Sequence, residues 1–457
     1  MKLHKTLMVA GVAAALSVTA DAQQNTYSGY FIEGNLYRHQ LNPAFGNDSL
    51  AYVAFPGLGN LNVGMHGNLH VDDILYNVNG RTTTFLNPAV DAGSFLSSLK
   101  DHNKVGADIN IPILSGGFKA WGGYNTVSIS ARATVNASIP RSVFSLLKEG
   151  ATNQTYDISD VRGRAYGYAE LAFGHSRQIT PKWRVGGKLK VLLGGADVDM
   201  KLSTANLTLG TDNWTATTDA EIRSSVKGLK YKTDVNDHTG HRYVSGMDVD
   251  GTGINGFGLG FDLGAAYTLN ADWSFSAAVQ DLGFIHWAND MLASTNGVQT
   301  FQTAVHTFSA DGDAPNSFDN EWKKIRNELS ALYELNDCGD AGGRTTGLNA
   351  TINLAAQYTL PYYRKLTFGL LNSTRIAGKF TTTDFRLSAN VAPVKVFSAG
   401  ANFAVGTYGC SFGWMLNAHP KYFNFFIAMD HTLGKLAKQG LPLSSNGSIN
   451  MGINFPF

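Results

Sequence analysis

The last eleven residues of the chain constrain its fold more than any other stretch. Residues 447–457 read GSINMGINFPF, so apolar side chains alternate with polar or small ones to the final residue. A strict period of two places Ile449, Met451, Ile453, Phe455 and Phe457 on one face of a β-strand and Ser448, Asn450 and Asn454 on the other. One face of such a strand suits lipid and the other suits a watery lumen, which predicts a strand of a transmembrane β-barrel. The alternative is an edge strand of a soluble β-sandwich.

The first 22 residues have the features of a secretory signal peptide. Basic residues at positions 2–5 precede an apolar run over residues 7–18, and Ala20-Asp21-Ala22 forms an A-x-A cleavage site. We therefore expect cleavage near Ala22, a mature chain that begins at Gln23, and export to the outer membrane. The residue directly after the cleavage site is Gln23 and not cysteine, which argues against a lipoprotein anchor. After this segment no run of about 18 apolar residues could form a spanning helix, so any membrane span must consist of strands.

Length and composition favour one large barrel over several soluble domains. A chain of 457 residues would ordinarily hold two or three domains, yet no Pro-rich or charged linker divides it. Charged residues make up 16% of the chain, below the roughly 25% of soluble domains, and a wall that faces lipid would lower that fraction. The 36 Lys and Arg residues balance 35 Asp and Glu residues to a formal charge of +1, which argues against nucleic acid as a partner.

Period-two alternation recurs along the chain and predicts an all-β fold, a transmembrane antiparallel β-barrel of about 14 strands. The clearest case is residues 127–139, where Val, Ile and Ala alternate with Ser, Arg, Thr and Asn. Short turns such as 180–182 and 270–272 alternate with long connections such as 139–164 and 196–252, as periplasmic turns alternate with extracellular loops. The predicted strands lie at 61–71, 105–113, 127–139, 165–173, 183–193, 257–267, 273–279, 348–358, 366–370, 385–391, 397–405, 410–418, 423–429 and 447–457.

Residues 23–59 lack this alternation and carry a turn signal at Asn42-Pro43. A barrel of about 14 strands is too wide for wall side chains alone to fill and narrower than the open porins. We therefore expect residues 23–59 to plug the lumen and residues 60–457 to form the barrel with its extracellular loops. Three loop stretches show helical spacing of apolar residues, at 88–99, 141–148 and 318–335, and these stripes either pack the loops or bind a partner.

Alternation also assigns a set of ionisable side chains to the lumen, because such groups on the lipid face would cost roughly 2–4 kcal/mol near the midplane. Two interpretations are open: ion pairs that anchor plug and wall, or a lining that selects a solute. Both signs occur and no ring of one sign is visible, which favours anchoring. The residues are Arg132, Glu170, Arg184, Lys188, Lys190, Asp262, Asp384, Arg386 and Asp430.

No motif predicts catalysis or a bound cofactor. Residues 251–256 match G-x-G-x-x-G, but a strand follows where a dinucleotide site needs a helix. Asp248 and Asp250 lack the Glu that an EF-hand requires, and the chain holds no G-x-S-x-G or H-E-x-x-H motif. His66 and His70 share a strand face and could share a metal, although a polar wall is the simpler interpretation. We expect no enzymatic activity, no metal and no cofactor.

The two cysteines fall on the outer side of the predicted topology, Cys338 in a long loop and Cys410 in a tight turn. The exported environment is oxidising, and a bridge that closes a long loop would restrict the unfolded chain. We therefore predict a disulfide between Cys338 and Cys410 that pins the loop over the barrel mouth. Two free thiols are the alternative.

Three stretches resemble a known superfamily. Residues 37–44 (YRHQLNPA), 256–264 (GFGLGFDLG) and 281–287 (DLGFIHW) are similar to a domain-of-unknown-function branch of the FadL-like outer-membrane barrels, the long-chain fatty acid transporter superfamily. Within the first stretch, Asn42, Pro43 and Ala44 resemble the Asn-Pro-Ala stretch in the amino-terminal hatch of that superfamily. The end of the chain also resembles the C-terminal signal of outer-membrane proteins, which implies that the assembly machinery recognises Ile453, Phe455 and Phe457.

The resemblance implies a hatch-blocked barrel in the outer-membrane lipid that passes a hydrophobic small molecule through a lateral opening. A second hypothesis is a non-transporting platform, since relatives of the superfamily in type IX secretion shuttle cargo proteins and residues 318–335 could present a binding surface. A third hypothesis, a surface hydrolase, would need His, Asp and Ser groups that converge at the barrel mouth. A continuous apolar path past the plug would favour the first.

Overall fold

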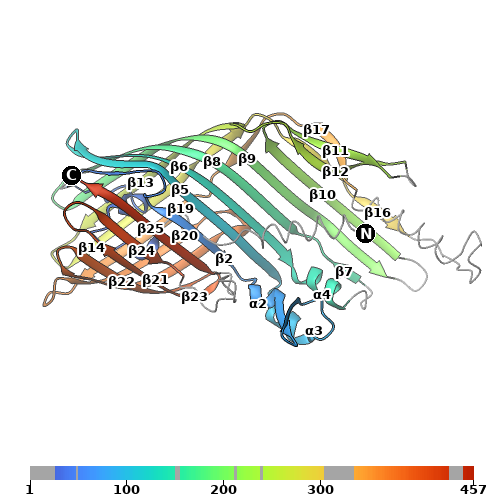
Figure 1. Ribbon diagram of the computed structural model, residues 1–457, viewed down its shortest axis with the longest axis horizontal. Coiled ribbons are helices and arrows are strands. Elements are labelled where there is room, and N and C mark those ends of the chain that lie inside the picture. The colour runs from blue at the N-terminus through green and yellow to red at the C-terminus, as the bar shows by residue number, and fades with distance from the viewer. Residues whose placement is uncertain are drawn as a thin grey trace, which may run out of the picture.

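Fourteen antiparallel strands close into a barrel in the computed structural model, which describes residues 26–47, 50–149, 155–209, 214–236, 240–302, 334–431 and 446–457 (Figure 1). Each barrel strand pairs with the next one, and β25 pairs with β2, as at Met451 and Leu61, to complete the ring. This confirms the predicted all-β barrel and its strand number. The predicted signal peptide and residues 318–333 of the third predicted helix lie outside the described residues. The barrel strands are β2 (Leu61–Gly67), β5 (His102–Ala120), β6 (Gly123–Pro140), β8 (Val161–Gln178), β9 (Trp183–Leu209), β13 (Gly256–Thr268), β14 (Trp273–Trp287), β19 (Thr351–Thr359), β20 (Leu366–Arg375), β21 (Thr382–Val394), β22 (Phe397–Gly406), β23 (Gly409–Ala418), β24 (Asn424–Met429) and β25 (Gly447–Pro456).

Alternate side chains of the barrel strands point outward, and these are mostly apolar. On β13, Phe257 and Phe261 are 56% and 48% exposed, whereas the neighbouring Asp262 is 1% exposed. An apolar outer face around a polar interior is the surface that a membrane-spanning barrel needs. No helix among the described residues is long and apolar enough to span a bilayer. Other large apolar side chains exposed around the ring include Ile111, Leu171, Leu189, Phe284, Leu354, Leu370, Leu387, Phe403, Phe412, Phe425 and Met451.

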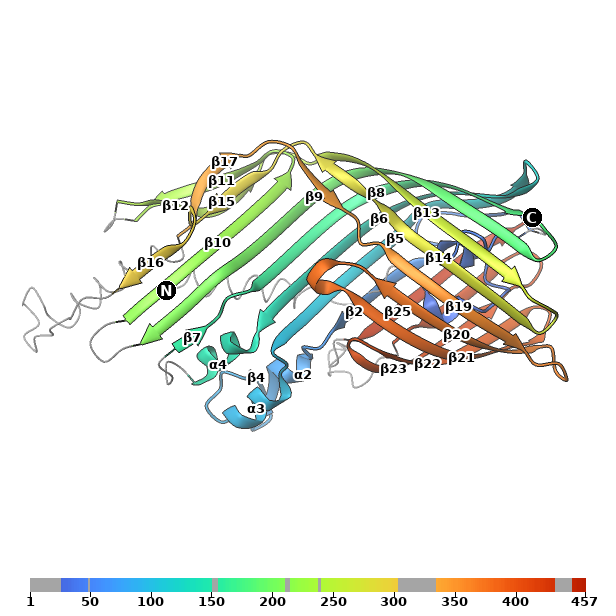
Figure 2. The same ribbon diagram turned by 180° about the vertical axis from the view of Figure 1, so that it is seen from behind.

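The wall is much taller on one side than on the other (Figures 1 and 2). β9 runs for 27 residues, about 90 Å of extended chain, and its second half pairs with β10 instead of β13. The sequence predicted a long loop over residues 196–252, but most of this stretch is sheet. Its alternation is fragmentary: residues 197–202 (DVDMKL) alternate, whereas residues 215–218 (TATT) do not. The additional strands of this tall wall are β10 (Trp214–Val226), β15 (Met291–Ser294), β16 (Gln299–Gln302), β17 (Asn336–Asp340) and β18 (Arg344–Gly347), beside a hairpin of β11 (Leu229–Val235) and β12 (Arg242–Val249).

The long connections after β2 and β6 fold together into a small helical layer with its own core. Two of the predicted helices are confirmed as α3 (Ala92–Ser98) and α4 (Arg141–Glu149). Phe85, Phe95 and Phe144 pack at the centre, with the ring centroids of Phe85 and Phe95 4.5 Å apart. The same connections hold α2 (Val71–Ile74), the hairpin of β3 (Leu75–Val78) and β4 (Arg81–Thr84), and β7 (Thr155–Asp157), which pairs with β9.

Candidate functional site

Residues 26–47, called here the luminal segment, lie inside the barrel near the end that carries the short turns (Figure 1). The segment forms two short 3₁₀ helices, η1 (Tyr27–Gly29) and η2 (Leu36–Gln40). Its apolar side chains pack against the inner wall, and Tyr30 and Leu41 are 0% and 2% exposed. One cluster joins Tyr30, Phe31 and Leu41 to Ala355 and Leu371, and another joins Ile32, Leu36 and Tyr37 to Met415 and Phe426.

The Asn-Pro-Ala stretch ties the inner end of the luminal segment to the wall. Asn42 is fully buried, and its Nδ2 donates to backbone carbonyls of β13 and β14 at 3.3 and 3.2 Å. Its Oδ1 accepts from the Ala44 N–H at 2.9 Å and so holds the turn. Gly186 makes room for Pro43, because a Cβ there would lie 2.3 Å from the Pro43 carbonyl carbon. The motif therefore packs directly on the wall.

Asp430 holds the other end of the luminal segment. This carboxylate is 0% exposed and accepts from the backbone N–H groups of Tyr27, at 2.9 Å, and Ser28. The Ser28 hydroxyl accepts from Asn402 Nδ2 at 2.9 Å. Arg386 donates to the Asp430 backbone carbonyl at 3.0 Å, so a buried guanidinium supports the same corner.

Buried charges on the wall form a balanced network, with three cations and three anions. Lys190 Nζ lies 2.6 Å from Asp262 and 2.5 Å from Asp281. Lys188 lies 3.7 Å from Asp262, and its Nζ also donates to the backbone carbonyl of His39 in the luminal segment at 3.5 Å. Because the charges pair with one another and with the segment, the geometry supports anchoring over a selective ring. The members are Arg132, Glu170, Lys188, Lys190, Asp262 and Asp281.

Sequence reasoning missed Asp281, which lies at the centre of this network. The register between β13 and β14 shifts beside Asp262, and Asp281 adopts a φ of 56°. This bulge turns Asp281 inward, where its N–H donates to Asp262 at 2.8 Å. The available signal was the pair Gln280-Asp281, two polar neighbours in a strand where alternation predicts one.

The remaining inward-facing candidates lie apart from the network. Arg184 is half-buried and donates to Ser176 at 3.1 Å, and Asp384 borders the outer pocket described below. His66 on β2 lies 3.0 Å from Asn136, whereas His70 precedes α2, so the two residues do not share a strand face. The described residues contain no group of three or more His, Cys, Asp or Glu side chains that could hold a metal ion.

The predicted disulfide is not formed. Cys338 and Cys410 are both free, exposed thiols. Cys338 lies on β17 in the tall wall, where its Sγ is 3.4 Å from the Ser294 hydroxyl, and Cys410 lies on β23 in the low wall (Figure 1). The sequence placed both thiols on the outer side but could not show that the wall has two heights, which separates them.

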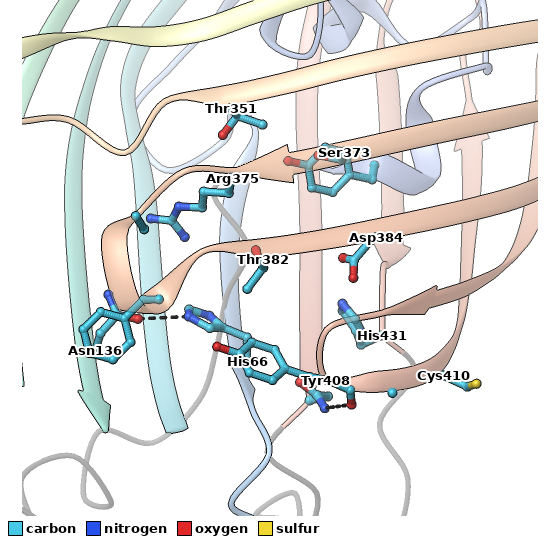
Figure 3. Close-up of a pocket in the computed structure, with 15 residues that line it drawn as sticks. His66, Asn136, Thr351, Ser373, Arg375, Thr382, Asp384, Tyr408, Cys410 and His431 are labelled. Atoms are coloured by element: carbon cyan, nitrogen blue, oxygen red, sulfur yellow. Dashed lines mark hydrogen bonds between the residues drawn. The ribbon is translucent and has the colours of Figure 1, made fainter. Parts of the chain in front are cut away.

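A pocket opens above the luminal segment at the outer mouth (Figure 3). The enclosed space that it offers is about 50 Å³, enough for a few water molecules. Tyr27 of the luminal segment lines it, and the rings of His66 and Tyr408 stack with centroids 5.9 Å apart. Ser373, Thr382 and Asp384 add polar groups from β20 and β21. The lining thus places both apolar and polar groups around a small space.

The loop between β20 and β21, residues 376–381, reaches across the mouth to the opposite wall (Figure 2). Lys379 pairs with Asp160 at the start of β8, and its backbone carbonyl accepts from Lys104 of β5. The Lys379 ammonium holds the pKa of the Asp160 carboxyl below its usual range. Just before the loop, Arg375 makes two hydrogen bonds with Asp108. These contacts narrow the entrance to the pocket.

One place in the ring of strands is filled by two short strands with a break between them. β1 (Tyr52–Ala54) and β2 both lie between β25 and β5, but residues 55–60 leave the ladder. Phe55 and Leu58 in this stretch are 50% and 43% exposed. β5 carries Pro112 opposite the break, and its register with β6 shifts there. The N–H of Ile453 donates to the Leu58 carbonyl, which keeps the wall closed.

The final strand lies beside this break. Asn450 and Asn454 on β25 are 0% exposed, whereas Met451 and Phe457 are 36% and 81% exposed. One face of the final strand is therefore buried and the other exposed, as its alternation predicts. Ile453 and Phe455 are half-buried between these limits.

These features define a closed, fourteen-stranded transmembrane β-barrel whose lumen is occupied by its own amino-terminal segment. The chain belongs to DUF5723, a family of unknown function, which it matches over residues 43–430. That match confirms the domain-of-unknown-function branch indicated by the sequence. A comparison with curated proteins finds no match.

Among solved structures, the barrel is similar to several hydrocarbon channels. The P. putida toluene transporter TodX is 9% identical, with 96% of this chain and 95% of that chain covered and a TM-score of 0.39. The Ralstonia pickettii toluene transporter TbuX is 9% identical, with 92% and 93% covered and a TM-score of 0.40. A Pseudomonas aeruginosa FadL homologue is 10% identical, with 96% and 98% covered and a TM-score of 0.37.

Proposed function

We propose that this protein is an outer-membrane channel for a small hydrophobic molecule and that the structure is its closed form. One observation carries the proposal: Tyr27, which borders the outer pocket, packs against the apolar cluster of Tyr30, Phe31, Leu41 and their wall partners. An apolar path thus continues downward from the pocket, filled by the side chains of the luminal segment. A molecule that displaced the segment would meet the apolar wall residues of this cluster, Ala355 and Leu371. No enzymatic step is required.

The break in the wall supplies a reason for the path to end in the membrane. The luminal segment precedes β1 in the chain, and residues 55–60 follow β1. A movement of the segment therefore pulls on a stretch whose ladder is already interrupted. Since Phe55 and Leu58 are exposed on the outer face, an apolar solute that left there would enter lipid without crossing water.

Two features support the outer membrane as the location. Fourteen strands, short turns at one end and an apolar outer face are typical of bacterial outer-membrane barrels. The sequence of residues 1–22 predicts export, with cleavage near Ala22. Within this proposal the assembly machinery recognises the last strand through Ile453, Phe455 and Phe457.

A reversible cross-link tests whether the luminal segment must move. A Cβ at Gly413 would lie 2.8 Å from Ser28 Oγ, so the sulfur atoms of cysteines at these two positions lie within reach of each other. The variant S28C/G413C, made with C338S and C410S to remove the native thiols, pins the segment to β23. We expect cells that carry the oxidised variant to take up the apolar dye N-phenyl-1-naphthylamine as slowly as cells without the barrel, and reduction to raise the rate.

The control is the C338S/C410S parent with and without reductant, which should behave identically. Equal uptake by the oxidised and reduced variant, above the level of cells without the barrel, would show that passage does not need the segment to move. Uptake by the reduced variant at the level of cells without the barrel would contradict passage of this apolar probe.

The tall wall favours a second function, an interaction platform. β10, β15, β16 and β17 extend the sheet well beyond the apolar part of the barrel, and the helical layer has a core of its own (Figure 1). Such a surface is larger than a pore alone requires. Native mass spectrometry after gentle extraction from the outer membrane distinguishes the two: a bound hydrophobic molecule supports the channel, and a stoichiometric protein partner without such a molecule supports the platform.

A further inference from the structure

The end of the barrel that carries the short turns is strongly basic. The turns and their flanks, residues 118–124, 176–184, 267–273, 358–366, 391–397 and 417–423, hold eight Lys or Arg residues and one Asp. The whole chain is nearly balanced, with 36 basic and 35 acidic residues, so the positive charge is concentrated at this end. The basic residues are Lys119, Arg177, Lys182, Arg184, Arg364, Lys365, Lys395 and Lys421.

Three of these eight cations are not used by the fold. Lys119, Lys182 and Lys395 are exposed, and their side chains have no hydrogen bond or ion pair with any described residue. The acid of this group, Asp272, is already paired with Arg364 at 2.9 Å. The uncompensated charge therefore faces outward, where it is available to a partner.

Pairs of aromatic side chains at the same end of the barrel indicate how deep these cations lie in the membrane. Trp183 and Tyr267 on neighbouring strands have ring centroids 4.7 Å apart, and Trp273 and Tyr358 repeat the arrangement at 4.8 Å. Aromatic side chains of this kind lie at the level of lipid headgroups. The cations flank them in the turns, as Lys421 shows, whose Nζ lies 5.2 Å from the ring centroid of Tyr422.

We infer that this basic rim binds the phosphate headgroups of anionic phospholipids in the leaflet that faces the short turns. Cations occur on five of the six turns, and these turns follow one another around the rim of the barrel (Figures 1 and 2). A protein partner would contact one side of such a rim, whereas a lipid shell contacts all of it. The rim thus selects anionic over zwitterionic lipid and fixes the depth of the barrel in the bilayer.

The triple variant K119Q/K182Q/K395Q tests this inference, since these side chains make no hydrogen bond or ion pair with a described residue. The control R81Q/K100Q/K227Q removes three exposed cations from the opposite end of the molecule. Each protein is reconstituted in phosphatidylcholine vesicles, and electron paramagnetic resonance measures how strongly spin-labelled phosphatidylglycerol associates relative to spin-labelled phosphatidylcholine.

At low salt we expect the parent and the control to prefer phosphatidylglycerol by roughly threefold, and the rim variant to lose about half of that preference. High salt should weaken the preference of the parent, because it screens exposed charges. Heat-modified migration on gels verifies that all three barrels are folded. Equal preference for the two lipids in the parent, or an equal loss in the rim and control variants, would overturn the inference.

Discussion

Replacement of Asp430 by alanine should release the outer end of the luminal segment while leaving the barrel folded. The buried carboxylate accepts two backbone N–H groups, from Tyr27 and Ser28. A hydrogen bond to a charged group contributes about 1.5–3 kcal/mol, so both together hold this end by roughly 3–6 kcal/mol. Once the end detaches, water hydrogen-bonds the freed groups and recovers part of this free energy. We therefore expect the substitution to lower the free energy of local opening by about 3 kcal/mol. Since each 1.36 kcal/mol is a factor of ten, the open population should rise about 150-fold.

Hydrogen–deuterium exchange of the segment measures that population. The N–H groups of Tyr30 and Ile32 are bonded inside the segment, to the carbonyls of Tyr27 at 3.0 Å and Gly29 at 3.2 Å, so they exchange only when it opens. A peptide that covers residues 27–32 should exchange about 150-fold faster in the D430A variant.

The matched control is Asp340→Ala, because the Asp340 carboxylate also accepts two backbone N–H groups, both at 2.9 Å, but in the tall wall. Unchanged exchange of residues 27–32 in D430A would refute the reasoning. The same acceleration in D340A would do so as well, since it would show a general loosening of the barrel.

Three further outcomes are expected. Phe95→Ala should cost about 3–5 kcal/mol within the helical layer, because this ring is 1% exposed, and limited proteolysis should cut the layer while the barrel stays resistant. The pKa of His241 is raised above its ordinary value by its hydrogen bond to Glu334, so this contact stabilises the tall wall fully below about pH 6.5. Its contribution should disappear as the pH rises through the higher folded pKa, and Glu334→Gln should lower the His241 pKa in an NMR titration. Truncation of Phe457 should reduce the folded, heat-modifiable barrel recovered from outer membranes, with total synthesis as the control.

The barrel could be predicted because alternation reports the two sides of a wall. The predicted strand 127–139 lies within β6, which extends from Gly123 to Pro140. The bounds were less accurate elsewhere: 61–71 runs past the end of β2 at Gly67, and 183–193 covers only the first part of β9. A strand at the lipid boundary must be apolar on one face along its membrane-spanning length, so the pattern is strong there. Beyond the membrane that requirement ends, and the alternation in the strands of the tall wall is only fragmentary, as in residues 197–202 (DVDMKL) and 215–218 (TATT).

The contacts across the lumen could not be predicted in the same way. Alternation showed that Lys190 and Asp262 point inward, but not that they meet, since the pairing depends on which strands are neighbours. Arg375 and Asp108 are 267 residues apart and come together only when the ring closes. Asp281 is inward because of a bulge, and a one-residue shift reverses the faces that alternation assigns.

The polar inner wall explains how a tightly packed luminal segment can also be removable. Wall amides bind the backbone of the segment: Asn353 Nδ2 donates to the Leu41 carbonyl at 3.0 Å, and Asn424 Nδ2 to the Gly34 carbonyl at 2.8 Å. These bonds come from side chains and not from a β-ladder, so water can take either partner when the segment moves. An apolar wall would hold the segment only by the burial of apolar surface, and departure of the segment would leave a cavity that water does not fill. The segment is thus fixed by interactions that water can replace, and this is the condition under which a barrel could open without losing its own ring of strands.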